Sequence, residues 1–123
     1  MANIVIFCCP KVTNKLGCSC AECLKEMRSR KGSYERYKNS QCLDLVGIIN
    51  CPGCPSQSGS ERIIQVMEHL MGFDVDKIHF TNCMSFFCAF RYEYQLLLEC
   101  RFPGIEVILG KYEPPVQTAL NNN

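Results

Sequence analysis

Cysteine is the residue type in this chain that could do chemistry. Eleven of the 123 residues are cysteines, a density otherwise typical of short secreted proteins held together by disulfides. The count is odd, so the thiols cannot all pair within one chain. Thiolates bind soft metals such as zinc and iron, and they exchange with disulfides. The composition therefore indicates a metal site, a redox site or thiols that serve as buried apolar groups.

Six of the cysteines follow apolar runs that have the composition of buried strands. In chain order they are Cys8 and Cys9, then Cys51 and Cys54, then Cys83 and Cys88. The carboxyl ends of parallel strands meet at one edge of a sheet, and open α/β folds bind ligands at that edge. These cysteines are therefore expected to come together in space although they lie far apart in the sequence.

The spacing of Cys51 and Cys54 is that of a metal-ligand pair. A proline and a glycine separate them, and such a turn lets both sulfurs face one ion. Cys8 and Cys9 are different, because adjacent residues of a strand point to opposite faces of the sheet. Only one of these two is expected to face the site.

A polar and basic stretch over residues 11–41 brings three further cysteines. They are Cys18, Cys20 and Cys23. Within the stretch, residues 21–30 have helical composition. Because the stretch begins at the end of the first apolar run, it can fold over the same sheet edge and add ligands.

The elements that must position these cysteines alternate between strands and helices. Strands are predicted over residues 3–7, 43–49, 77–81 and 105–109, and helices over residues 21–30, 60–71 and 90–102. This order predicts a single three-layer α/β domain over residues 1–112. Its four-stranded, mainly parallel sheet would have right-handed crossovers, as in Rossmann-like and flavodoxin-like folds.

Three details of the fold follow from local patterns. The run over residues 43–49 does not alternate, which predicts a central strand buried on both faces. Ser58 and Glu61 have the spacing of a capping box at the start of a helix. Residues 113–123 contain two prolines and three terminal asparagines and are expected to form a flexible tail.

Four other residues could bind a metal but have simpler interpretations. Cys42 and Cys100 are expected to be buried apolar groups. His69 lies beside a glutamate on the polar stripe of its helix and is expected to be solvated. His79 lies within a predicted strand, away from the end that bears cysteine, and is expected to pack in the sheet.

Charge and hydropathy limit the classes of function. The net charge is +1, so neither nucleic acid nor an anionic membrane is an expected partner. The N-terminus has no basic run, and the apolar stretch over residues 4–7 is too short for a signal peptide or a membrane span. A cytoplasmic location, where thiols stay reduced, is therefore expected. The sequence contains no Walker loop and no G-x-G-x-x-G motif.

Five segments, taken in order, resemble the CGGC-domain family, a group of small cysteine-rich prokaryotic proteins named for a central C-G-G-C-P motif. They are Ile4-Val5-Ile6-Phe7-Cys8-Cys9, Cys18-Ser-Cys-Ala-Glu-Cys23, Lys31-Gly-Ser-Tyr-Glu-Arg-Tyr37, Gly47-Ile-Ile-Asn-Cys-Pro-Gly-Cys-Pro55 and the stretch from Thr81-Asn-Cys83 to Cys88. The resemblance runs from residue 3 to about 110 and rests on the ordered set rather than on one motif. It implies a metal-binding domain, with zinc as the first candidate.

The resemblance also implies which cysteines are ligands. By position they are Cys9, Cys18, Cys23, Cys51, Cys54, Cys83 and Cys88. The remaining four cysteines have no counterpart in the family pattern. This chain departs from the motif at Pro52, which replaces the first glycine and stiffens the turn. Residues 110–112 offer no histidine, which favours a site made only of sulfur.

Three functions remain open. Four of the candidate cysteines would make a closed site for Zn²⁺, and the same ligands suit an iron–sulfur cluster. Alternatively, Cys51-Pro-Gly-Cys54 would exchange thiols with disulfides, as in redox proteins with a C-x-x-C pair. A third function is the transfer of metal or sulfur to a partner protein.

Overall fold

The computed structural model describes residues 2–11, 14, 17, 20–38, 42–55 and 58–110. Its elements in chain order are β1 (Ala2–Cys8), α2 (Ala21–Ser29), the 3₁₀ helix η1 (Gly32–Tyr37), β2 (Leu43–Asn50), α3 (Gly59–Leu70), the 3₁₀ helix η3 (Met71–Phe73), β3 (Lys77–Phe80), α4 (Asn82–Phe87), α5 (Arg91–Arg101) and β4 (Glu106–Leu109). Cys18 and the predicted tail over residues 113–123 lie outside the described residues.

The four strands form one parallel sheet, as predicted. Their order is β2-β1-β3-β4, and each neighbouring pair runs parallel. The prediction that β2 is central is wrong, because β2 lies at an edge. Its apolar side chains are half-buried or exposed, and none of its eight residues is buried. β1 and β3 occupy the centre, where neighbours cover both edges of each strand.

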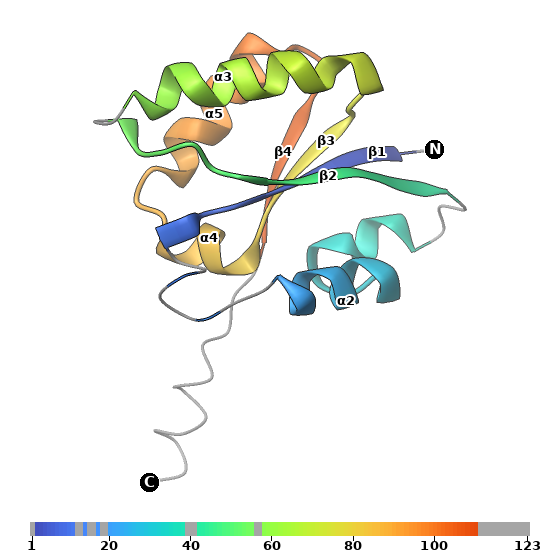
Figure 1. Cartoon of the computed structure of the whole chain (residues 1–123). Coiled ribbons are helices and arrows are strands. Elements are labelled where there is room, and N and C mark those ends of the chain that lie inside the picture. The colour runs from blue at the N-terminus through green and yellow to red at the C-terminus, as the bar shows by residue number, and fades with distance from the viewer. Residues whose placement is uncertain are drawn as a thin grey trace, which may run out of the picture.

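Helices cover both faces of the sheet and make three layers. Figure 1 shows α3 and α5 on one face and α2 with η1 on the other. The two faces of β1 separate accordingly. Val5 and Phe7 pack with side chains of α3 and α5. Ile4 and Ile6 pack with Met27 of α2 and the tyrosines of η1. This alternation also determines where the cysteines at the end of β1 point.

One local prediction about helices is wrong, and one helix was not predicted. Ser58 is in the left-handed region, with φ 62°, and its side chain makes no capping hydrogen bond with any described residue, so the predicted capping box is wrong. Ser58 does occupy the N-cap position, and the helix begins at Gly59. The short helix α4 was not predicted, because six residues are too few to show a helical period. Thr81 caps α4 through a hydrogen bond in which its hydroxyl accepts from the Met84 amide at 3.2 Å.

The two cysteines expected to be buried are exposed. Cys42 precedes the edge strand β2, where few side chains can cover it. Cys100 lies two residues after the buried Leu98, so it points away from the face of α5 that packs on the sheet. The predictions for the histidines are confirmed, because His69 is exposed and His79 is fully buried.

None of the helices in the described part of the chain is long and apolar enough to cross a membrane.

His79 makes the folded state sensitive to acid. Its Nε2 lies 2.6 Å from the Tyr37 hydroxyl, and its ring stacks on Tyr34 with the ring centroids 4.3 Å apart. Burial is the main reason that the pKa of His79 is lowered from 6.5 to about 4; the positive charges of Arg36 and Lys77 contribute to the shift, and Glu106 opposes it. The histidine therefore stays neutral in the folded protein under conditions in which it is protonated in the unfolded chain.

We predict that the free energy of unfolding falls as the pH drops from 6.5 towards 4. The folded pKa lies below the unfolded one, so the contribution is fully present above pH 6.5 and is lost at about pH 4. The unfolded and folded pKa values of His79 differ by about 2.5 units, which corresponds to a loss of about 3 kcal/mol in the free energy of unfolding. Urea unfolding at several pH values measures this loss. A His79→Phe variant removes the titration, so parallel pH profiles for the two proteins would contradict the prediction.

Candidate functional site

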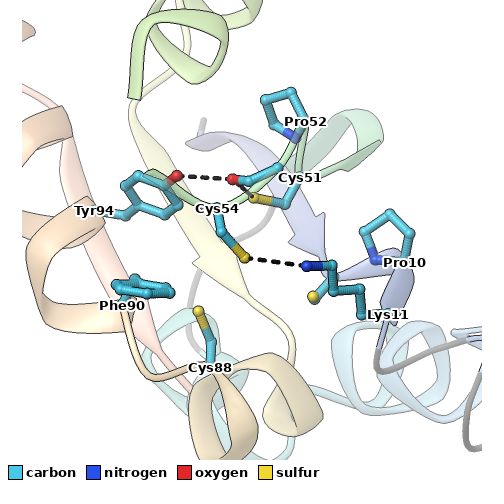
Figure 2. A pocket seen from close by; sticks show the side chains of 10 residues that line it. Pro10, Lys11, Cys51, Pro52, Cys54, Cys88, Phe90 and Tyr94 are labelled. Atoms are coloured by element: carbon cyan, nitrogen blue, oxygen red, sulfur yellow. Dashed lines mark hydrogen bonds between the residues drawn. The ribbon is translucent and has the colours of Figure 1, made fainter. Parts of the chain in front are cut away.

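Four cysteines from three separate segments line one cavity at the carboxyl edge of the sheet. The cavity has a volume of about 210 Å³. Its sulfur-bearing residues are Cys9, Cys51, Cys54 and Cys88, all of them predicted ligands. The other lining residues are Pro10, Lys11, Pro52, Gly53, Phe90 and Tyr94. Figure 2 shows the sulfurs of Cys54 and Cys88 pointing towards each other across this space. We call it the thiol cavity.

Cys9 and Cys51 are positioned by the sheet itself. Cys9 follows the odd-numbered residues of β1, such as Phe7, onto the face covered by α3 and α5, where it packs against the core. The Cys51 amide donates to the Cys8 carbonyl at 2.7 Å, which extends the β1–β2 hydrogen bonding one residue beyond β2. The prediction that cysteines gather where parallel strands end is thus confirmed for these two.

Cys54 is positioned by a turn that α5 holds in place. The Gly53 carbonyl accepts a hydrogen bond from the Tyr94 hydroxyl at 2.7 Å and another from the Cys51 thiol at 3.5 Å. Gly53 has φ 143°, a conformation that side-chain-bearing residues rarely adopt. The Gly59 amide then donates to the Cys54 carbonyl at 3.0 Å and joins the turn to α3.

The electrostatics of the thiol cavity disfavour several thiolates without a cation. Burial raises the pKa of Cys51, and the neighbouring Cys9, Cys88 and Cys54 raise this pKa further, although a hydrogen bond with Gly53 opposes the shift. Burial is also the main reason that the pKa of Cys88 is raised. Like charges close together oppose each other's ionisation, so a bound cation would favour the thiolate forms.

One cation already contacts a sulfur of the cavity. The Lys11 ammonium lies 3.5 Å from the sulfur of Cys54, which is half-buried. Figure 2 shows Lys11 reaching across the cavity mouth from the segment that follows β1. Neither Lys11 nor Tyr94 was identified from the sequence as part of the site. The position of Lys11, two residues after Cys9, was the signal that could have indicated it.

Two other predicted ligands that the structure describes, Cys83 and Cys23, do not line the cavity. Cys83 is half-buried in the first turn of α4 and does not line the cavity. Cys23 is buried in α2, which covers the opposite face of the sheet. Cys18 is not among the described residues. Within the described part of the chain, no three cysteine, histidine or carboxylate side chains are already arranged as the ligands of one metal ion.

The fold and the cavity define a three-layer α/β domain with a cysteine-lined edge. The sequence matches the CGGC domain family over residues 3–112, and the protein belongs to that family, as its resemblance implied. An uncharacterized protein of Methanocaldococcus jannaschii is 30% identical over 85 residues, which are 66% of this chain. The chain covers 61% of that relative, less than two thirds of its length. No solved structure matches the chain.

A substitution at Gly59 tests how the C-x-x-C turn is held. A Cβ at Gly59 would collide with the Gly53 carbonyl and the Tyr94 hydroxyl. We expect Gly59→Ala to displace the turn and to lower the free energy of unfolding by about 1–3 kcal/mol. Urea unfolding measures the loss, and the rate of Cys51 alkylation reports whether the turn has opened.

Gly72 provides the matched control, because a Cβ there meets no atom within 4 Å. We expect Gly72→Ala to leave the stability unchanged or to raise it by up to about 1 kcal/mol. Equal stability of the two variants would show that the close approach at Gly59 does not hold the turn.

Proposed function

We propose that this protein binds zinc or an iron–sulfur cluster through Cys9, Cys51, Cys54 and Cys88. The observation that supports the proposal is that these four thiols, from three distant segments, line one cavity. Four thiolates are the ligands of structural zinc sites and of the common iron–sulfur clusters. The metal supplies the positive charge that stabilises the thiolates, and binding releases their protons.

The chemistry of the lining residues fits a soft metal. The described residues around the cavity include four cysteines but no carboxylate and no histidine. Such a set disfavours Mg²⁺ and Ca²⁺, which prefer oxygen. Phe90 and Tyr94 form an apolar wall that limits the access of water to the sulfurs. The hydrophobic shell around a metal site tunes its chemistry in this way.

The two kinds of metal centre need different spacings of the sulfurs. A zinc–sulfur bond is about 2.3 Å long, so four sulfurs around one ion lie close together. Among the described residues, no three ligand-type side chains are already grouped in this way. A zinc ion would therefore require the cavity sulfurs to move closer together. In a cluster, the sulfides of the cluster itself separate the protein thiolates.

We also place the protein in the cytoplasm as part of this proposal. The four thiols of the cavity are free rather than joined in disulfides. A reducing compartment keeps them in the form that binds metal.

The test is metal analysis of the full chain purified without oxygen. We expect bound zinc or iron in the wild type, with visible charge-transfer absorption if a cluster is present. Cys9→Ser, Cys54→Ser and Cys88→Ser should each lower the metal affinity at least about 10-fold, because each removes one of four ligands. Thermal unfolding should show that the variants still fold, since the cores on both faces of the sheet are built mainly of aliphatic and aromatic side chains.

Cys42→Ser and Cys100→Ser are the matched controls, because both cysteines are exposed and neither lines the cavity. They should keep the full metal content. Cys83→Ser asks whether a predicted ligand outside the cavity takes part. Full metal occupancy in all three cavity variants would refute the proposal.

A thiol–disulfide function of Cys51 and Cys54 is the second candidate. The contact between Lys11 and Cys54 favours it, because a nearby cation promotes the thiolate that attacks a disulfide. The start of α3 at Gly59, five residues after Cys54, weighs against it, because Cys54 is not part of the first turn of the helix, where the effect of the helix dipole is greatest. A metal-free protein with a reversible two-electron couple at these cysteines would support this alternative.

A further inference from the structure

A second group of cysteines lies on the other face of the sheet. Cys8 follows the even-numbered residues of β1, such as Ile6, towards the layer of α2. There it meets Cys20 and Cys23 at the start of that helix. All three are buried, with 3%, 8% and 7% of their surfaces exposed, respectively. We call them the α2 thiol group, and none of them lines the thiol cavity.

Cys8 is held where β1 and β2 end. Its thiol donates a hydrogen bond to the Asn50 side-chain oxygen at 3.1 Å and lies 3.7 Å from the Ile49 carbonyl. It also has a hydrogen bond with the thiol of Cys20. Burial raises the pKa of Cys8 to about 12, and the neighbouring Cys20 and Cys23 contribute to the shift. The hydrogen bond between the two thiols places Cys8 beside Cys20.

Cys20 reaches Cys8 through an unusual backbone conformation. It precedes the first residue of α2 and has φ 65°, in the left-handed region that residues with a Cβ seldom adopt. Its carbonyl accepts from the Leu24 amide at 3.1 Å, so the residue is joined to the first turn of the helix. The helix is in turn tied to the sheet edge, because the Asn82 amide group donates to the Glu26 carboxylate at 2.9 Å.

We propose that Cys8 and Cys20 form a reversible disulfide by exchange with a low-molecular-weight disulfide such as oxidised glutathione. Cys20 is the more exposed of the two, so its sulfur attacks first, forms a mixed disulfide with one glutathione and releases the other as a thiol. The sulfur of Cys8 then attacks Cys20 and releases the second glutathione. Two protein thiols are oxidised to one disulfide, one glutathione disulfide is reduced to two thiols, and the two thiol protons pass to the released glutathione.

The disulfide would act on the thiol cavity through the chain between its two ends. The loop that it closes contains Cys9 and Lys11, which both line the cavity. Oxidation of the α2 thiol group would thus constrain Cys9, a proposed metal ligand. It would also constrain Lys11, the cation that contacts the proposed ligand Cys54. The site itself involves no cavity thiol, so its existence does not depend on metal binding.

The experiment uses the full-length, metal-free protein equilibrated in glutathione redox buffers and then alkylated. Tandem mass spectrometry of the peptides identifies each disulfide. We expect a Cys8–Cys20 disulfide that forms and disappears reversibly with the buffer ratio, together with a higher thermal midpoint in the oxidised form. A disulfide that joins Cys20 to any other cysteine, or the persistence of Cys8 as a thiol in the most oxidising buffer, would overturn the proposal.

Adjacent substitutions separate this site from the thiol cavity. Cys8→Ser should abolish the disulfide and leave metal binding by the cavity unchanged. Cys9→Ser should keep the disulfide and lower the metal affinity. Cys20→Ser tests the same bond from its other end if Cys8→Ser folds poorly. If Cys9→Ser abolishes the disulfide while Cys8→Ser retains it, the assignment of the two cysteines to opposite faces is wrong. If the disulfide behaves as expected but no variant binds metal, only the proposed metal function fails.

Discussion

Parallel pairing of β1 with a neighbour on each side is the constraint on which the arrangement of the cysteines depends. Ile4, Val5, Ile6 and Phe7 are fully buried, two on each face of the sheet. A slip of one residue would turn every one of these side chains to the other face. Burial of each is worth about 1.5–3 kcal/mol, far more than a thiol gains from either environment. The core therefore determines that Cys8 and Cys9 face different layers.

The same constraint explains how much of the fold could be predicted. Strand positions and the parallel arrangement followed from apolar runs that alternate with helical segments. Strand order did not, because β1 and β2 are both apolar runs of similar composition. Only the pairing shows that β1 is central and β2 is at an edge. The exposure of Cys42 depends on that order. The exposure of Cys100 was readable from its spacing to Leu98.

The candidate site was predictable where cysteines follow strands directly and less so where helices intervene. Cys9 and Cys51 are placed by hydrogen bonding and side-chain alternation that any parallel pair imposes. β3 runs instead into α4, whose six residues carry the chain onward, so Cys88 at its end reaches the cavity while Cys83 in its first turn does not. Tyr94 was missed because a tyrosine at helical spacing indicates only a core position. Its hydroxyl bond to Gly53 becomes visible only when α5 is packed against the turn.

Charge balance makes Lys11 a suitable neighbour for either of the proposed metal centres in the thiol cavity. Four thiolates around Zn²⁺ carry a net charge of about −2, and four thiolates around a doubly positive four-iron cluster carry the same. A buried net charge is costly unless an opposite charge or hydrogen bonds accompany it. The Lys11 ammonium, 3.5 Å from the Cys54 sulfur, supplies part of that compensation. The segment that carries Lys11 begins at Cys9, so the strand end that provides the first sulfur would also provide the cation that offsets the charge of the proposed site.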